Sequence, residues 1–444
     1  MEFTKTNLSN KNFLFVNITV DDCYYGVNQG ISILVPIVKK FSYNVSCLDI
    51  NSTMDTENFY QQVLAFNPSI VAFSFIANQY KYLKKYSDTL AKAAEILQIA
   101  GGTGITLDFE NYLNNTSLNG ICIGEGETPM TNLLTRIEKQ QDIYDTPGFY
   151  WKKNGILIKN NIPQFVDNLS TLDFPDFSVF NKNSVVNEIK QAQVVITRGC
   201  IYNCHYCCNS ALSSIYPSKK QFYRAPSIEY SISFLEKLKK DYPDIEDIIF
   251  LDEFIIANEA WFIGFAKEYE KRIHLPNACC LRIESITPNT ARALKNMGCQ
   301  WARIGLECGC EDFRKKILNR NYSNKSFIEK CTILKNEGIK IFTFNMIGLP
   351  FEGVEEREKT LNLNKAIDAD SGICTFFYPF KGTKLYEICK ENNLLKDNHE
   401  VLKITNFSNV PGIKMTKYDE TQCVLMQQVL TLFLKRKLLK RKNY

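Results

Sequence analysis

Three cysteines carry the most specific chemical signal in the sequence. Cys200, Cys204 and Cys207 stand at Cys-x3-Cys-x2-Cys spacing within residues 197–207. Three thiolates on one short loop can hold three irons of a [4Fe–4S] cluster. The fourth iron then has no protein ligand, so it can bind a substrate or a cofactor. The spacing therefore predicts an iron–sulfur centre with one open position.

Two other interpretations of these cysteines are open. Zinc prefers a closed site of four ligands, usually built from paired Cys-x2-Cys knuckles. His205 and Cys208 are the nearby candidates for a fourth ligand, but their spacing fits no common zinc pattern. The three thiols could also be unrelated buried cysteines, which their spacing and context disfavour.

The composition describes a globular protein of more than one domain. The chain has 444 residues, of which 45% are hydrophobic and 23% charged, so two or three domains are expected. The net charge of +5 is too small to argue for nucleic-acid binding. There is no apolar run of the length that spans a membrane and no apolar leader, so we expect a cytoplasmic protein whose 16 cysteines are mostly reduced. The basic end of the chain, residues 435–444, is expected to be a solvated helix end.

A strand-then-helix rhythm runs through the region that contains the cysteines. Six apolar segments alternate with helical stretches, and we predict strands at 193–197, 247–252, 277–282, 301–306, 340–347 and 372–378. Six such units predict a partial (β/α)6 barrel over residues 191–395. The cysteines follow the first of these strands directly.

A similar rhythm at the start of the chain predicts a separate α/β domain. Apolar strands near residues 13–16, 45–50, 70–75, 98–100 and 120–123 alternate with helices, which indicates a doubly wound, Rossmann-like parallel sheet over 1–145. Residues 146–190 are rich in Pro, Asn and Asp and are expected to form a linker with a hairpin near Lys153-Asn154-Gly155. Residues 396–444, with a helix over 419–440, are expected to form a small helical region that caps the barrel.

The second domain resembles the radical S-adenosylmethionine (SAM) superfamily. The match rests on the Cys-x3-Cys-x-aromatic-Cys motif, with Tyr206 in the aromatic position, just after a barrel strand. The resemblance implies that Cys200, Cys204 and Cys207 bind a [4Fe–4S] cluster whose open iron chelates SAM. It also implies reductive cleavage of SAM to a 5′-deoxyadenosyl radical, which abstracts hydrogen from unactivated carbon.

Further segments resemble the SAM-binding parts of that family in the same order. Asp252 and Glu253 look like the acidic pair that receives the SAM ammonium, and Arg282 is a candidate for the SAM carboxylate or a substrate anion. Glu307 would face the ribose hydroxyls. Asn345 and Ile347 belong to a segment that resembles the strand beside the adenine.

Residues 1–140 resemble the cobalamin-binding domain that often precedes this kind of barrel. The resemblance implies a cobalamin site at glycine-rich loops, with these residues: Gly26, Gly101, Gly102, Thr103, Gly124 and Glu125. Domains of this type that supply a lower axial histidine use Asp-x-His-x-x-Gly. The matching loop here has Cys23 in place of that histidine, and no histidine occurs before residue 205. Cys23 as a cobalt ligand is the less favoured interpretation, since free cysteines are more often packed.

Two cysteines next to Glu307 admit a second chemical interpretation. Cys308 stands where the family has a serine, and Cys310 follows two residues later. A thiol there could donate a hydrogen atom to a substrate radical. A small buried residue is the favoured alternative.

The leading hypothesis is a cobalamin-dependent radical SAM enzyme that transfers a methyl group to carbon through methylcobalamin. The main alternative is a radical SAM enzyme whose first domain is not catalytic, acting in carbon–carbon coupling, rearrangement or epimerisation. A non-enzymatic iron–sulfur or zinc regulator is the third hypothesis. The expected partners are a small-molecule, lipid or peptide substrate and an electron donor such as flavodoxin or ferredoxin.

Overall fold

The computed structural model describes residues 10–20, 26–75, 79–92, 96–216, 218, 222–397 and 410–441. The chain divides into two compact units. The first comprises Met1–Val185 with Ala211–Gln221, and the second comprises Val186–Ser210 with Phe222–Tyr444. The first unit thus extends beyond the expected boundary at residue 145 and takes in a short segment from the middle of the chain.

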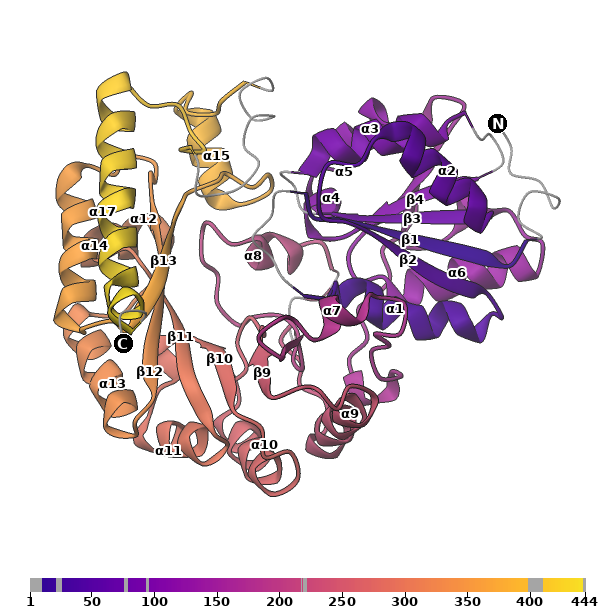
Figure 1. Ribbon diagram of the computed structural model, residues 1–444. Coiled ribbons are helices and arrows are strands. Elements are labelled where there is room, and N and C mark those ends of the chain that lie inside the picture. Colours follow the sequence, from indigo (N-terminus) through magenta and orange to yellow (C-terminus); the bar gives the residue numbers. More distant parts are fainter. Residues whose placement is uncertain are drawn as a thin grey trace. The chain divides into compact units, whose positions relative to one another are not determined.

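The first unit is the expected doubly wound domain. Its sheet has the order β2-β1-β3-β4-β5-β6-β7, and the first five strands are parallel. They are β1 (Asn12–Ile18), β2 (Asn44–Ile50), β3 (Ile70–Phe75), β4 (Leu97–Gly101) and β5 (Gly120–Cys122). The helices α1 (Gln29–Lys40) and α6 (Glu127–Glu138) lie on one face. The other face carries α2 (Thr56–Phe66), α3 (Tyr80–Leu90), α4 (Thr103–Leu107) and α5 (Phe109–Asn115), as Figure 1 shows. Burial on both faces explains the continuous apolar runs of these strands.

The expected linker contributes two strands to the same sheet. β6 (Phe149–Lys153) pairs antiparallel with β5, and β7 (Ile156–Lys159) closes a hairpin with β6. Asn154 and Gly155 take φ of 50° and 78°, which a two-residue hairpin turn requires. Trp151 is fully buried against the bare backbone of Gly120, where a Cβ atom would lie 2.3 Å from its ring. This packing joins residues 146–159 to the first domain; beyond them lies the short helix α7 (Lys182–Val185).

The second unit is an open, curled sheet of six parallel strands. The order is β13-β12-β11-β10-β9-β8, so β8 and β13 are its edges and the predicted partial barrel is confirmed. The strands are β8 (Gln191–Val194), β9 (Asp247–Phe250), β10 (Asn277–Leu281), β11 (Cys299–Glu307), β12 (Lys340–Ile347) and β13 (Ser371–Phe376). Its outer helices are α9 (Ile228–Asp241), α10 (Glu259–Arg272), α11 (Pro288–Asn296), α12 (Glu311–Leu318), α13 (Asn324–Asn336) and α14 (Val354–Ala366) (Figure 1).

Side-chain burial distinguishes the two faces of this sheet. Along β12, Ile341, Thr343, Asn345 and Ile347 are buried, and the residues between them are partly exposed. Thr343 and Asn345 both bond to Asn364 of α14, so the buried set faces the helices. β11 alternates in the same way. The opposite, inner face is therefore not filled by packing as a closed barrel would be.

The C-terminal helix has a different position from the expected cap. α17 (Lys417–Arg441) lies along the edge strand β13 and beside α14 (Figure 1). Gln427 donates to the Cys374 carbonyl at 3.0 Å, and Arg436 and Lys437 form ion pairs with Asp368 at 2.7 Å. The helix thus covers the edge strand, and these two basic side chains are paired within the unit. No helix in the described part of the chain is long and apolar enough to cross a membrane.

Candidate active site

The three cysteines lie on the loop that follows the carboxyl end of β8. Cys204 is buried, and Cys200 and Cys207 are partly buried. Gly199 has φ of 76°, and a Cβ atom there would lie 2.2 Å from the Phe222 carbonyl oxygen, so the loop needs glycine at this point. Farther along the loop, the His205 carbonyl accepts from the Leu385 N–H at 3.0 Å, and the His205 N–H donates to the Leu318 carbonyl at 3.1 Å. The loop is therefore fixed by the backbone on either side of the thiols.

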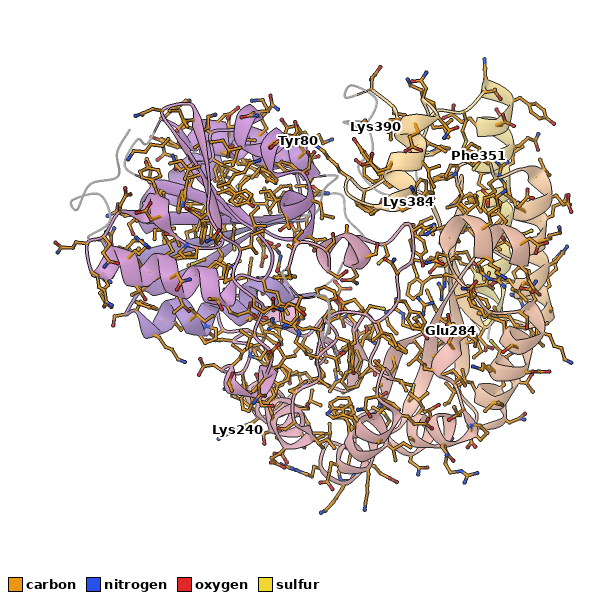
Figure 2. The ribbon with its side chains drawn as sticks, turned by 180° about the vertical axis from the view of Figure 1, so that it is seen from behind. Tyr80, Lys240, Glu284, Phe351, Lys384 and Lys390 are labelled. Atoms are coloured by element: carbon orange, nitrogen blue, oxygen red, sulfur yellow. The ribbon has the colours of Figure 1, made fainter. Side chains whose placement is uncertain are left out.

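The chemistry of these donors suits an iron–sulfur cluster, although no three Cys, His, Asp or Glu side chains of the described residues are already gathered as a metal site. Burial raises the pKa of Cys200 to about 11, so this thiol keeps its proton until a metal displaces it. Arg282, at the end of β10, supplies positive charge: its Nη1 lies 3.1 Å from the Cys204 Sγ. The guanidinium is held on the Tyr202 ring, 3.5 Å from its centroid, and by Glu284 at 2.6 Å (Glu284 is labelled in Figure 2). A cation in this position stabilises a thiolate ligand.

The two acidic residues after β9 have different environments. The Asp252 carboxylate is buried and accepts from the backbone N–H of Ile196 at 3.1 Å and from the Thr197 hydroxyl at 2.6 Å. It therefore anchors the start of the cysteine loop. Glu253 is exposed, and its charge acts on Cys207, which places it near the thiols. Of the predicted pair, Glu253 is the candidate for the SAM ammonium, and Asp252 is a positioning residue.

Asp252 makes the stability of the protein depend on pH. Burial raises its pKa to about 6, above its value in the unfolded chain, so the folded state binds the proton more tightly. The stabilising contribution is complete below about pH 4 and is lost as the pH rises through about 6. We expect the unfolding free energy of the wild-type apoprotein to fall relative to that of Asp252→Asn by on the order of 2 kcal/mol from pH 4 to pH 7. Urea unfolding of both proteins across this range measures it, and a constant difference would contradict the assignment.

A buried cluster of Tyr206, Glu307 and Arg320 lies at the end of β11. The Arg320 Nη1 is 3.0 Å from the Glu307 Oε1 and 3.2 Å from the Tyr206 hydroxyl, which itself donates to Glu307 at 3.1 Å. Gly305 makes room for this cluster, because a Cβ atom there would lie 2.5 Å from the Glu307 Oε1. The structure therefore brings Tyr206 and Glu307 together, although 100 residues separate them in the sequence.

Arg320 is a functional candidate that the sequence interpretation missed. Its side chain is 2% exposed, yet its Nε and Nη2 have no hydrogen-bond partner among the described residues. Buried donors without a partner are costly, so these two N–H groups suit an acceptor on a bound ligand. The only sequence signal was a basic residue just after Asn319, which ends α12 in the left-handed conformation.

Two predicted SAM contacts have side chains on the helix-facing side of the sheet. Asn345 donates to the Thr343 hydroxyl at 3.0 Å and accepts from Asn364 at 2.8 Å, and Ile347 is fully buried. These side chains do not reach the inner face. Only the backbone groups of Asn345 and Ile347 could therefore contact SAM there. Phe344 and Met346 are the side chains of β12 on the inner side.

Cys308 lies inside a hydrophobic cluster. It is 0% exposed and packs with Leu318, Leu349 and Phe377, among others. Burial raises its pKa to about 12. This environment favours the packing role over hydrogen-atom donation, because the thiol has no open face toward a ligand.

The loops proposed for cobalamin all follow carboxyl ends of parallel strands in the first unit. Gly26 follows β1, Gly101, Gly102 and Thr103 follow or end β4, and Gly124 and Glu125 follow β5. Ligands of open α/β sheets bind at this edge. Gly26, Gly102 and Gly124 have φ of 129°, 115° and 80°, so the backbone there uses glycine's freedom. Cys23 and the loop 21–25 lie outside the described residues.

Tyr216 supports the last of these loops and was not foreseen from the sequence. Its hydroxyl accepts from the Glu125 N–H at 2.8 Å, and its ring packs edge-on against Phe165. The Gly124 N–H donates to the Thr106 hydroxyl at 3.1 Å. The loop 124–126 is therefore held from two sides within the first unit.

Two family profiles match the chain, one in each unit. The profile of the Radical SAM superfamily matches residues 194–363, and that of the B12 binding domain matches residues 19–134. An uncharacterized methyltransferase of Pyrococcus horikoshii is 24% identical over 424 residues, covering 93% of this chain and 89% of that protein. The bacteriochlorophyllide d C-8(2)-methyltransferase of Chlorobaculum tepidum is 24% identical over 315 residues. The match covers 67% of this chain and 63% of that protein.

Solved structures share the fold of most of the chain. The radical SAM methyltransferase TsrM of Kitasatospora setae has a TM-score of 0.71 at 15% identity, over 93% of this chain and 83% of its own. The cobalamin-dependent radical SAM enzyme OxsB has a TM-score of 0.68 at 16% identity, over 89% of this chain and 56% of its own. The family profiles therefore show that the chain contains a radical SAM domain, over residues 194–363, preceded by a B12-binding domain, over residues 19–134.

Proposed function

We propose that the protein is a cobalamin-dependent radical SAM methyltransferase. The observation that carries this proposal is the combination, in one chain, of a three-thiol loop at a strand end and a B12-binding domain with positive-φ glycines at its ligand edge. Relatives and structural neighbours named as methyltransferases support it. When bound, the cluster supplies the electron that cleaves SAM, and cobalamin carries the methyl group.

The residues of the second unit have separate tasks in this proposal. Cys200, Cys204 and Cys207 hold the cluster, and Arg282 stabilises the thiolate of Cys204. Glu253 receives the SAM ammonium, and Glu307 accepts hydrogen bonds from the ribose hydroxyls. These roles suit the positions of the side chains at carboxyl ends of parallel strands, where ligands of such sheets bind.

Arg320 binds the SAM carboxylate in this proposal. Its two unpartnered N–H groups form a fork that matches a carboxylate, and its fixed place beside Glu307 orders it before the ligand arrives.

We expect Arg320→Met to raise the dissociation constant of SAM by at least about a hundredfold, because the variant loses two charged hydrogen bonds that contribute roughly 1.5–3 kcal/mol each. Arg320→Lys keeps the positive charge but not the paired N–H donors. Its dissociation constant for SAM should lie between those of the wild type and Arg320→Met. The affinity is measured by equilibrium dialysis on the cluster-loaded protein, with iron content as the control. Unchanged SAM affinity in Arg320→Met, with full iron, would contradict the role.

The proposal extends to the partners of the reaction. The methyl acceptor is a small molecule, a lipid or a peptide, and the electron comes from a low-potential donor such as flavodoxin or ferredoxin. All cysteines of the described residues are free thiols, which suits the reducing cytoplasm where such donors work.

The experiment is anaerobic reconstitution with iron, sulfide, hydroxocobalamin and SAM that carries a deuterated methyl group, followed by reduction. We expect 5′-deoxyadenosine and label in the cobalamin fraction, both read by mass spectrometry. Iron-loaded protein that yields neither would refute the proposal. Production of 5′-deoxyadenosine with no label on cobalamin would instead favour a radical enzyme that does not transfer methyl groups.

A further inference from the structure

The inner face of the second sheet carries an arginine that has no task in the proposed SAM site. Arg303 lies in the middle of β11, on the partly exposed side of the strand, four residues before Glu307. In the sheet register it stands beside Cys280 of β10 and Phe342 of β12. It therefore lies on the same inner face as the residues proposed to bind SAM. Those residues lie at the carboxyl ends of the strands, and Arg303 lies farther from these ends, in the middle of β11.

Arg303 differs from the other two arginines of this face in having no acidic partner among the described residues. Arg282 pairs with Glu284 at 2.6 Å and Arg320 pairs with Glu307 at 3.0 Å. Arg303 makes no ion pair or side-chain hydrogen bond within the described part of the chain. Its close neighbours are the rings of Phe342 and Phe344, whose centroids lie 5.0 Å and 5.2 Å from its Cζ. These ring contacts orient the guanidinium but leave its N–H groups open.

The poor solvation of the unpaired Arg303 guanidinium indicates that this face binds a ligand. A cation on a half-buried apolar face is poorly solvated unless an anion meets it. The described residues of the neighbouring strands offer aromatic surface but no carboxylate in contact with Arg303. The face thus combines the N–H donors of one unpaired guanidinium with two partly exposed aromatic rings. This set matches an anionic oxygen group attached to a flat or apolar body.

We propose that Arg303 binds a carboxylate or phosphate group of the methyl acceptor, with the apolar part of that substrate against Phe342 and Phe344. The inference rests on the proposed function, since it assigns the substrate class of the same site. It limits the acceptor to an anionic molecule and excludes neutral substrates. The SAM carboxylate is left to Arg320, which lies at the strand end beside the ribose-facing Glu307.

The test uses the protein loaded with cluster and SAM, kept without reductant and without air. The probes are benzoate and phenyl phosphate, with benzamide as the neutral comparator, and binding is measured by isothermal titration calorimetry. We expect one or both anions to bind and benzamide not to bind. Arg303→Gln should weaken the bound anion roughly ten- to a hundredfold, and Arg303→Lys should weaken it less. The better of the two anions distinguishes a phosphate from a carboxylate substrate.

Arg292→Gln is the matched control, because Arg292 is an exposed arginine on the outer helix α11. It should bind the anions as the wild type does. The inference is overturned if neither anion binds, if benzamide binds as well as the anions, or if Arg303→Gln binds them unchanged. Iron content is measured on the same samples, and 5′-deoxyadenosine formation is measured on separate portions after a reductant is added, so a failure of the proposed function is distinguished from a failure of this inference alone.

Discussion

Replacing Cys200, Cys204 and Cys207 together by alanine is expected to remove the iron and to reduce SAM cleavage to background. Each of the three sulfurs is the proposed ligand of one iron, so no further thiol of the pattern can replace a lost ligand. The backbone anchors of the loop through His205 do not involve the thiols, so the second unit should still fold. Iron and sulfide analysis, 5′-deoxyadenosine by mass spectrometry and circular dichroism measure the three consequences.

Cys208→Ala is the matched control for this experiment. Cys208 is a partly buried thiol directly after the third ligand, at the start of α8 (Cys208–Leu212), and it is not part of the three-thiol pattern. This variant should keep its iron and its SAM cleavage. If the triple variant kept its iron, or if Cys208→Ala lost it, the ligand assignment would be wrong.

The second large effect is expected in the first unit, where Gly124→Ala should weaken cobalamin binding at least tenfold and leave the cluster intact. Gly124 has φ of 80°, and an added Cβ atom would lie 2.5 Å from the Tyr216 hydroxyl. The left-handed backbone disfavours alanine by roughly 1–2 kcal/mol, and the contact forces either the loop or Tyr216 to move. Since this loop is at the ligand edge of the sheet, we expect at least a tenfold loss of cobalamin affinity and loss of methyl transfer.

Gly155→Ala separates backbone strain from the effect on the loop. Gly155 has φ of 78°, almost the same as that of Gly124, but nothing lies within 4 Å of an added Cβ atom. It should lose some stability and keep its cobalamin affinity. The affinities are measured by absorbance titration with hydroxocobalamin, together with iron content. Equal cobalamin binding by the Gly124→Ala variant and the wild type would contradict the assignment of this loop.

The strands were predictable because their signal is local. β12 and β3 have the predicted bounds, 340–347 and 70–75, since runs of apolar residues between turn signals mark strands that are buried by helices. The proposed centre of the site also rests on a local signal, because the three cysteines lie within eight consecutive residues. The family resemblance assigned Tyr206 and Glu307 to one proposed SAM site, and their side chains are hydrogen-bonded to each other in the structure.

The remaining features depend on contacts that the sequence does not display. Which of Asp252 and Glu253 is free to meet a ligand depends on which carboxylate accepts from the Thr197 hydroxyl and N–H, and this is a tertiary contact. The side to which Asn345 points is set by its pairing with Asn364, nineteen positions later. Arg320 and Tyr216 lie in irregular segments with no periodic pattern. Apolar residues are spread around the helix 417–441, and Leu425, Val429 and Leu432 are exposed, so the side that packs against the edge strand could not be read from the pattern.

The most direct test of the account is the electron paramagnetic resonance spectrum of the reduced, anaerobically reconstituted protein before and after SAM is added. We predict about four irons per chain and a reduced-cluster signal whose g-values shift when SAM binds, because one iron has no protein ligand. A colourless protein, or a cluster signal that SAM leaves unchanged, would contradict the claim that these three cysteines hold a cluster open to SAM.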